Sequence, residues 1–439
     1  MLMENNNIKY PRILVISNNP FSNITNNGKT LASFFTEFPS ENIYQLYFSS
    51  ELPDNTHYKN YFKISDDDII KSILKRNDIC GEIIDYKTLK QIKINQNNKN
   101  SFDTFIKSIK KYNILRIIRE MLWLSKRWNT ELLSQWVKEI SPEIIFLCAG
   151  DSGFAYDITK YIQEISGAKL VVYITDDYVL PRKTLSPFWW IRRNYILNKM
   201  KYTVQRSDLF ITISQKMRVE YRKLFGKDSI LAMNMTESMK DDTITVDNKT
   251  ILTLVYAGGL HYNRYKTLNL LAKLLKRYNH EFGGNRKAYL KIYSSQKLNR
   301  KMLKYLNIEG ASEFCGKLNS KQLKETLNSC DILVHVESFD KKSIEATRLS
   351  ISTKIPEYLS LGKPILAIGP EQIASMEFLE DSAFCITDQH NIYFKLIRLL
   401  NDTKLHNELS KKALVKFNSN SLKEKTIGKL MKSILDIYK

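Results

Sequence analysis

The sequence predicts an α/β protein made of two Rossmann-like, doubly wound parallel-sheet domains. Its 439 residues suit two domains of about 200 residues each. Short apolar runs, typical of buried strands, alternate with helical segments in two series. The polar, aperiodic segment 237–250 lies between the series. We therefore expect an N-terminal domain over 1–240, a C-terminal domain over 241–415 that faces it across a cleft, and a final helix over 416–439 that could pack back on the first domain.

The first series is interrupted by a long insertion. The predicted strands are 12–17, 42–49, 143–150, 169–177, 208–214 and 229–235, and the predicted helices between them are 31–38, 154–166, 188–207 and 215–226. Residues 54–140 break this rhythm. Their first part, 54–100, is rich in Asn, Asp and Lys and predicts weak structure with a short helix near 67–76. The rest predicts two helices, so we expect the insertion to be largely helical.

The second series is more regular. Its predicted strands are 252–259, 288–294, 312–318, 331–336, 365–369 and 383–387, with helices over 266–279, 297–307 and 320–329. The last fifty residues read as helices with basic surfaces. Both series therefore predict parallel sheets covered by helices.

The charge and the cysteines narrow the classes of partner and site. A net charge of +21 predicts an anionic partner, which could be a nucleic acid, an acidic membrane surface or a phosphorylated substrate. The five cysteines form no C-x-x-C pair, so we expect a reducing compartment and no structural zinc. An apolar signal region and a long apolar span are both missing from the sequence, which predicts a cytoplasmic protein that could bind a membrane peripherally.

The stretch 352–370 combines three kinds of chemistry. Ser352, Thr353 and Lys354 precede a predicted helix that carries Glu357 and ends at Gly362. Free N–H groups and the positive dipole end make a helix N-terminus suitable for an anion. A carboxylate one turn further could accept hydrogen bonds from a diol. The combination predicts a site for a nucleotide diphosphate, and the alternative is an ordinary capped helix.

Small, polar or charged residues also follow the other strands of the second series. Ligands of doubly wound sheets bind outside the carboxyl ends of the strands. Each of these residues could instead belong to a turn or be a solvated cation. They are Gly258, Gly259, Arg264 and Lys266 after the first strand, Ser294 after the second, Gly316 and Lys317 after the third, and Glu337 after the fourth.

The segments "AGGLHYNRYK" and "PEYLSLGKPIL" resemble motifs of the GT-B glycosyltransferases, most closely the retaining E-x7-E type, which is glycosyltransferase family 4-like. The resemblance implies that Glu357 binds the donor ribose and that Arg264 and Lys266 neutralise the donor diphosphate. It implies a nucleotide-diphosphate sugar as donor, a UDP-sugar above others, with no cofactor and no metal. The loop around Gly28 would also line the cleft.

The first Glu of the E-x7-E pattern is absent, because that position is Leu349. Glu337 and Glu345 have the right spacing, but no "GKP" follows the second of them. The chain resembles a branch without the first Glu, in which Ser352, Thr353 and Lys354 take over contacts to the phosphates and the sugar.

Catalysis in this family requires no protein nucleophile, because the leaving diphosphate helps to deprotonate the acceptor. Positive charge from Arg264 and Lys266 would stabilise that leaving group. On the acceptor side, Asp176 or Asp177 could bind the acceptor hydroxyl or act as the base, and Asp151 is a rival. Each of these carboxylates could instead cap the next helix.

The resemblance predicts a glycosyltransferase that moves a sugar, with retention, to a cell-surface glycan or a lipid-linked acceptor. The aromatic and basic segment 185–202 and the basic helix 105–127 could contact an anionic membrane, or they could be partly buried helices. One alternative function is a nucleotide-sugar 2-epimerase, for which His261 is the available histidine. The other is a basic nucleic-acid-binding protein that uses 105–127, although we expect no nucleic acid.

Overall fold

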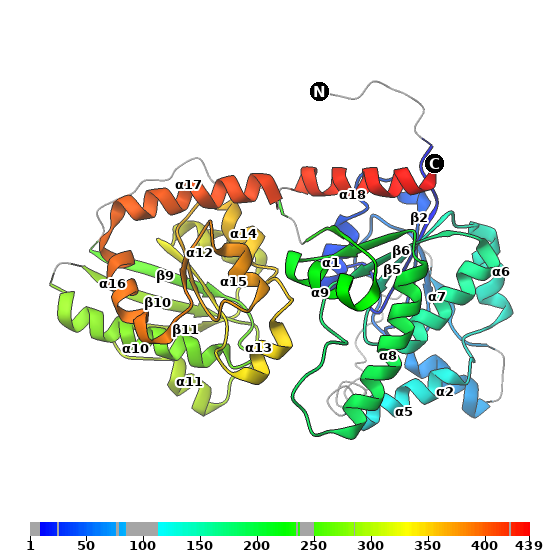
Figure 1. The fold of residues 1–439 in the computed structure, drawn as a ribbon, viewed down its shortest axis with the longest axis horizontal. Coiled ribbons are helices and arrows are strands. Elements are labelled where there is room, and N and C mark those ends of the chain that lie inside the picture. Colours follow the sequence, from blue (N-terminus) through cyan, green and yellow to red (C-terminus); the bar gives the residue numbers. More distant parts are fainter. Residues whose placement is uncertain are drawn as a thin grey trace. The chain divides into compact units, whose positions relative to one another are not determined.

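The structure is a computed structural model that describes residues 9–23, 26–75, 79–84, 113–233, 236–237, 250–284, 286–420 and 423–439. The chain divides into two compact units (Figure 1). Unit 1 runs to Ile213 and also contains Arg218–Ala232 and Ile427–Lys439, and unit 2 contains Ser214–Met217 and Met233–Thr426. Most of the predicted linker 237–250 and residues 105–112 of the predicted basic helix lie outside the described residues.

Unit 1 is built on an eight-stranded sheet of order β4-β3-β2-β1-β5-β6-β7-β8. The strands are β1 (Ile13–Ser17), β2 (Ile43–Tyr47), β3 (Asn60–Lys63), β4 (Glu82–Ile84), β5 (Ile144–Ala149), β6 (Lys169–Ile174), β7 (Leu209–Thr212) and β8 (Ile230–Leu231). All neighbours pair in parallel except β3 and β4. Every residue of β1 is buried, as expected for a parallel strand covered on both faces.

The helices of unit 1 connect these strands. They are α1 (Asn26–Ser33), α2 (Asp66–Lys75), α5 (Asn113–Leu124), α6 (Glu131–Ile140), α7 (Gly153–Ser166), α8 (Pro187–Arg206) and α9 (Gln215–Phe225). Helix α7 packs on β1 and β5, and α8 packs on β6, α7 and α5. Gly167 ends α7 with a left-handed φ of 68°, which glycine adopts without strain.

Unit 2 contains a six-stranded parallel sheet of order β11-β10-β9-β12-β13-β14. The strands are β9 (Ile251–Ala257), β10 (Lys287–Tyr293), β11 (Ser312–Gly316), β12 (Ile332–Val336), β13 (Ile365–Ile368) and β14 (Phe384–Ile386). Numbered within the unit, the order is 3-2-1-4-5-6, the order of a Rossmann fold. The chain reverses its direction of winding between β9 and β12, which are hydrogen-bonded neighbours.

The helices of unit 2 cover both faces of the sheet, and each face has its own apolar core. They are α10 (Arg264–Phe282), α11 (Arg300–Leu306), α12 (Ser320–Ser329), α13 (Lys341–Thr347), α14 (Ile355–Ser360), α15 (Ala374–Leu379), α16 (Ile392–Asn401) and α17 (Thr403–Asn420). A last helix, α18 (Lys423–Tyr438), follows. Its residues from Ile427 onward group with unit 1, where the Tyr438 hydroxyl lies 3.2 Å from Glu143 Oε1.

The predicted fold class of two Rossmann-like parallel-sheet domains is confirmed. The short helix predicted near 67–76 is confirmed by α2. The prediction of weak structure for the rest of 54–100 is wrong for the part that the structure describes, because β3 extends the sheet beside β2 and β4 pairs with β3. The apolar positions of β3 are few, since the strand has only four residues, and only Tyr61 and Phe62 are buried. No helix among the described residues is long and apolar enough to cross a membrane.

Candidate functional site

The carboxyl ends of the strands of unit 2 bring several predicted residues to one edge of the sheet. The Gly258 N–H donates to the Tyr293 carbonyl at 3.0 Å, and the Ser294 N–H donates to the Gly316 carbonyl at 2.9 Å. Gly316 has a φ of 80°, which a side chain would strain, and Lys317 after it is exposed. The ends of β9, β10 and β11 therefore form a continuous row, as parallel pairing requires.

A buried ion pair occupies the point where the direction of winding reverses. Glu337, directly after β12, accepts two hydrogen bonds from Arg264, at 3.0 Å from Nε and 2.8 Å from Nη2. The Glu337 side chain is only 2% exposed and the Arg264 side chain 16%. The neighbouring Gly369 leaves room for this carboxylate, because a Cβ there would lie 2.7 Å from Glu337 Cβ.

Electrostatics keep both partners of this pair charged. Burial alone would raise the pKa of Glu337, but the neighbouring His335 and the charge of Arg264 outweigh it, so the pKa lies below its usual value. His335 Nε2 lies 3.4 Å from Glu337 Oε1. Burial lowers the pKa of Arg264, and the charge of Glu337 more than offsets this. Because Arg264 uses two of its five N–H groups for Glu337, a phosphate would have to share this guanidinium.

The loop between β9 and α10 has a constrained backbone. Tyr262 and Asn263 both have left-handed φ values, of 56° and 58°. A Cβ at Gly259 would lie 2.3 Å from His261 Nε2, so glycine allows the exposed imidazole to fold over this position. Burial, followed by the charge of Arg264, lowers the pKa of His261. Lys266, in the first turn of α10, is exposed and lies near the carboxylate of Asp340.

Tyr358 anchors the first turn of α14 to the end of β9. Its buried hydroxyl accepts a hydrogen bond from the Ala257 N–H at 3.0 Å and donates to the Ala257 carbonyl at 3.3 Å. Glu357 directly precedes Tyr358 in the sequence, and Tyr358 contacts Ala257, the residue before Gly258. Lys354 Nζ lies 2.8 Å from Glu357 Oε2, and both side chains are about three-quarters buried.

The start of α14 has fewer free N–H donors than we expected from the sequence. Pro356 has no N–H, and the Ile355 N–H donates to the Ser352 carbonyl at 3.1 Å. The Ser352 N–H donates to Ser375 Oγ, and Ser352 Oγ accepts from the Lys354 N–H. Thr353, between them, is half-buried. An anion here would depend mainly on the Lys354 ammonium.

Leu349 takes the position at which the E-x7-E pattern carries its first Glu. Its side chain is 1% exposed, so the position is apolar in space as well as in sequence. The buried carboxylate of this unit is that of Glu337, which comes from the end of β12 instead.

In unit 1, Asp151 belongs to an arginine cluster. Its Oδ2 accepts a hydrogen bond from Arg116 Nη1 at 2.8 Å and forms an ion pair with Arg192 Nη2 at 2.8 Å. Burial would raise the pKa of Asp151, but the positive charges of Arg192 and Arg116 outweigh it and hold the pKa below its usual value. A carboxylate with a lowered pKa is a weak general base at neutral pH.

The other acceptor-side candidates differ from each other. Asp177 is buried and its Oδ1 accepts the N–H groups of Val179 and Leu180, at 3.2 and 2.9 Å, so it organises its own loop. Asp176 is exposed.

Gly28 lies in the first turn of α1, where a Cβ would be 2.4 Å from the Pro20 carbonyl oxygen. Close packing against the loop after β1 therefore explains this glycine.

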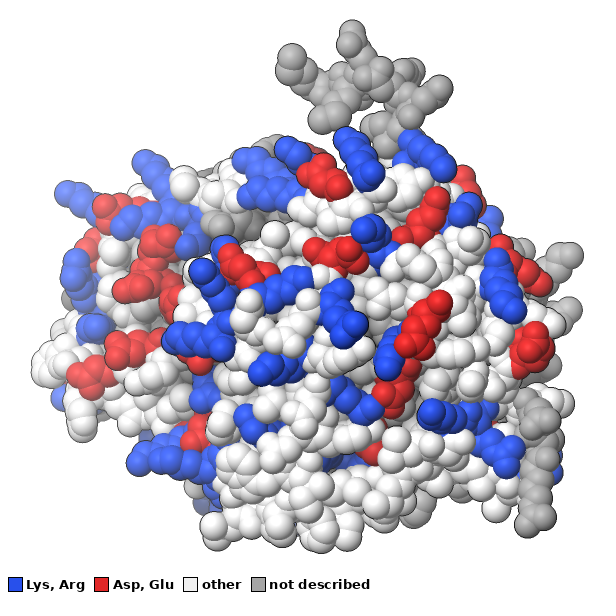
Figure 2. All heavy atoms as spheres, turned by 45° about the vertical axis from the view of Figure 1, so that its right-hand side comes forward, with Lys and Arg blue, Asp and Glu red and all other residues white. Residues whose placement is uncertain are grey.

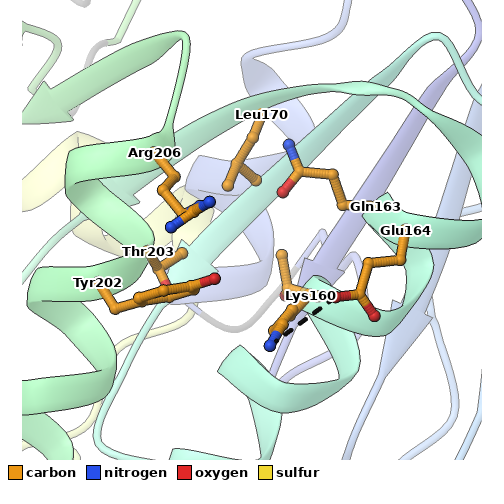
Figure 3. Close-up of a pocket in the computed structure, with 8 residues that line it drawn as sticks. Lys160, Gln163, Glu164, Leu170, Tyr202, Thr203 and Arg206 are labelled. Atoms are coloured by element: carbon orange, nitrogen blue, oxygen red, sulfur yellow. Dashed lines mark ion pairs between the residues drawn. The ribbon is translucent and has the colours of Figure 1, made fainter.

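Unit 1 also has a groove that is separate from the predicted site residues. A groove between α7 and α8 contains Lys160, Glu164, Tyr202 and Arg206 (Figure 3). Lys160 is paired with Glu164 at 3.8 Å, and the groove contains none of the predicted site residues. Within the described ranges, no group of three His, Cys, Asp or Glu side chains could hold a metal ion.

The structure therefore brings Arg264, Gly258 and Glu337 together at one strand edge and attaches α14 to it through Tyr358. Sequence reasoning missed the anchoring role of Tyr358 and the arginines around Asp151. The tyrosine inside "EYLSLGKP" was the only sequence signal for the role of Tyr358. Nothing in the spacing of the sequence indicated the arginines around Asp151.

Comparisons with known proteins gave similarity in structure only. No protein-family model matches the sequence, and no curated protein matches it. Three solved structures of similar architecture are Anabaena HepE in complex with UDP, a glycosyltransferase from Rickettsia africae and the α,α-trehalose 6-phosphate synthase from Burkholderia multivorans.

These similarities extend over nearly whole chains at very low sequence identity. HepE is 11% identical with a TM-score of 0.60, covering 96% of this chain and 99% of its own. The Rickettsia enzyme is 12% identical with a TM-score of 0.57, and the Burkholderia synthase is 8% identical with a TM-score of 0.59, each covering 98% of both chains. The chain therefore has the two-domain fold of the GT-B glycosyltransferases.

Proposed function

We propose that the protein is a glycosyltransferase that uses a nucleotide-diphosphate sugar, with donor binding in unit 2 and acceptor binding in unit 1. The observation that supports this most directly is the edge of unit 2. There the buried Arg264–Glu337 pair lies at the reversal of winding, where doubly wound sheets bind their ligands, and Tyr358 ties the helix of Glu357 to the same edge.

The Lys354–Glu357 pair suits a nucleotide in two ways. The Glu357 carboxylate can accept hydrogen bonds from the two ribose hydroxyls, and Lys354 can then turn to a phosphate oxygen. Both groups are partly exposed, at 25% for Lys354 and 23% for Glu357, so a ligand can reach them. UDP-sugars are the donors we favour, since the structurally similar HepE has been solved with UDP and with UDP-glucose.

Transfer would rely on positive charge and on positioning. Arg264 and Lys266, both in the first turn of α10, would stabilise the departing diphosphate without a metal ion, and Gly258 and Gly259 would let it approach the backbone. Ser294, Gly316 and Lys317 would line the same edge. With the sugar transferred on one face with retention, the diphosphate itself would accept the proton of the acceptor hydroxyl. Among the aspartates, exposed Asp176 is the one that an acceptor hydroxyl could reach from the solvent side.

The acceptor would be a glycan at the cell surface or one linked to a lipid, because unit 1 has an exposed apolar face. Helices α5 and α8 lie side by side, and large apolar side chains on them are exposed, Met121 by 62% and Ile191 by 60% (Figure 1). We define this apolar face by Ile114, Ile118, Met121 and Leu124 of α5 and by Leu185, Phe188, Trp190 and Ile191 at the start of α8.

An anionic bilayer fits this face. Lysines and arginines are spread over the surface drawn in Figure 2, and a broad area low on that surface carries no charge. Apolar side chains next to cations are the pattern of interfacial helices, in which the aromatic and aliphatic groups enter the headgroup region. Attraction between the +21 chain and anionic lipids would add to this burial.

A thermal-shift titration with UDP tests the donor site. A ligand that binds only the folded state raises its stability by mass action, by about 2.7 kcal/mol at a hundredfold excess over Kd. We expect wild-type protein to be stabilised and Glu357→Ala to lose that stabilisation. Glu220→Ala is the matched control, because Glu220 is also paired with a lysine three residues away, at 3.4 Å from Lys223.

Full stabilisation of Glu357→Ala by UDP would contradict the assignment of the ribose site. Product analysis with and without acceptor separates transfer from epimerisation, for which the exposed His261 would be the proton-transferring group. Conversion of the sugar without any acceptor would favour the epimerase.

A further inference from the structure

Unit 1 has a pocket at its own reversal of winding, apart from the donor edge. Strand β1 pairs with β2 on one side and with β5 on the other. The pocket, of about 210 Å³, opens at the carboxyl ends of these three strands. Its lining includes Asn18 after β1, Ser49 after β2, Asp151 after β5, and Arg116, Arg119 and Arg192 from the helices. This is where a doubly wound sheet binds a ligand.

Carboxylates hold the three guanidinium groups in place: Asp151, which lines the pocket, pairs with Arg116 and Arg192, and Asp66, outside the lining, pairs with Arg119. Arg119 Nε contacts both oxygens of Asp66, at 2.8 and 2.9 Å, and its Nη1 lies 3.1 Å from Ser152 Oγ. Arg116 and Arg192 share Asp151, as described above, and Arg192 also donates to the Asp151 carbonyl. Their positions are therefore fixed before any ligand arrives, which lowers the entropic cost of binding.

The lining favours an anion. It contains three arginines against two carboxylates, those of Asp151 and Glu120. Glu120 accepts the N–H groups of Gly153 and Phe154 at the start of α7, at 2.9 and 3.3 Å, so its charge is directed to that helix. Arg192 keeps a buried Nε without a hydrogen-bond partner. Planar guanidinium groups match the oxygens of phosphate in pairs.

The size and surroundings indicate which anion. A cavity of about 210 Å³ is smaller than the roughly 300–1,000 Å³ of sites that hold whole small molecules, so it suits a phosphate or diphosphate group. Arg116 belongs to α5 and Arg192 to α8, the two helices that form the apolar face. A phosphate in the pocket would therefore lie beside a surface suited to lipid.

We propose that this arginine pocket binds the phosphate or diphosphate group of the acceptor, so that the acceptor is a phosphorylated carrier and not a neutral glycan. The identification of this phosphate as part of an acceptor rests on the proposed glycosyltransferase function, whereas phosphate binding by the pocket does not depend on that function. A phosphate bound to a lipid and one on a soluble sugar present the same oxygens to the pocket, and the apolar face favours the lipid.

Calorimetric titration of the full chain with inorganic pyrophosphate, in saturating UDP to fill the donor site, tests the pocket. We expect Arg116→Gln to weaken pyrophosphate binding about tenfold, the loss of one charge-assisted contact. Arg218→Gln is the control and should bind like wild type, since Arg218 is 36% exposed against 35% for Arg116 and is likewise paired with an aspartate. Equal affinity of Arg116→Gln and wild type would overturn the proposal.

A second arm distinguishes the source of the phosphate. Vesicles of phosphatidylcholine with and without a polyprenyl phosphate are compared by co-sedimentation for the same variants. Binding that depends on both the polyprenyl phosphate and Arg116 supports a lipid carrier, and pyrophosphate binding without it indicates a soluble phosphorylated acceptor. If UDP fails to stabilise the protein but Arg116→Gln still loses pyrophosphate, the transferase function falls and the pocket stands.

Discussion

The Arg264–Glu337 pair allows the sharpest test of the structure. Replacing Glu337 by glutamine keeps the shape of the side chain and removes its charge, leaving the Arg264 guanidinium buried without a counter-ion. Removing one partner of a buried ion pair costs about 3–5 kcal/mol. Since glutamine still offers one oxygen to Arg264, we expect the lower end of that range, which shifts the melting temperature of a unit of this size by roughly 6–12 °C.

Chemical denaturation followed by circular dichroism measures the change in the free energy of unfolding. Glu281→Gln serves as the control, because Glu281 also accepts a hydrogen bond from an arginine, Arg277, but on the exposed surface of α10, where ion pairs contribute little. The double variant Arg264→Met/Glu337→Leu should recover most of the lost stability, since it leaves no buried charge. A change below about 1 kcal/mol in Glu337→Gln would refute the reasoning.

The same pair makes a prediction about pH. The pKa of Glu337 in the folded protein lies below its ordinary value of 4.5, so its contribution to stability is present above pH 4.5 and is lost as the pH falls through the folded-state pKa. The difference in stability between wild type and Glu337→Gln should therefore shrink as the pH is lowered from 4.5. A difference that stayed constant down to acid unfolding would show that the carboxylate is not held ionised.

Two more substitutions test the close packing at Gly28 and vesicle binding by the apolar face. Gly28→Ala should destabilise the protein by about 1–3 kcal/mol, because its Cβ would meet the Pro20 carbonyl, whereas Gly428→Ala, with nothing within 4 Å, should be neutral or stabilising in the same denaturation assay. Ile191→Asp should weaken co-sedimentation with anionic vesicles several-fold, whereas Val415→Asp, at an apolar position on α17 that is at least as exposed, should not. Equal loss in both variants of either pair would contradict the interpretation.

Much of the fold follows from the sequence because buried parallel strands are continuous apolar runs. Runs such as Ile365–Ile368, all buried, can be found without knowing their neighbours. Strand β3 was missed because it has only two apolar residues, Tyr61 and Phe62, between the polar Asn60 and Lys63, a pattern shared with loops. Local pattern therefore failed where a strand is short and pairs with only one strongly apolar neighbour.

The site was harder to predict than the fold. The sequence pointed to Arg264, Glu357 and the glycines through motif spacing, but it gave no sign that Arg264 is neutralised by Glu337, 73 positions away. Similarly, the residues next to Asp151 in the sequence do not indicate that it pairs with Arg116 and Arg192, which come from two other helices. Charge pairing across the fold depends on three-dimensional neighbours, so spacing alone could name candidate residues without stating their charge balance or their accessibility.

The bond between Tyr358 and Ala257 has a consequence for the order of folding. The two residues are 101 positions apart, so closing this loop costs entropy that only the finished unit can offset. During synthesis the first strand of unit 2 emerges about 100 residues before its partner helix. At the 5–20 residues per second typical of translation, that is a delay of roughly 5–20 s in a bacterial or eukaryotic cell. Until then the edge that holds Gly258 and Arg264 cannot be complete. Protection of the chain against proteolysis by added UDP should therefore appear only in chains extended past Tyr358.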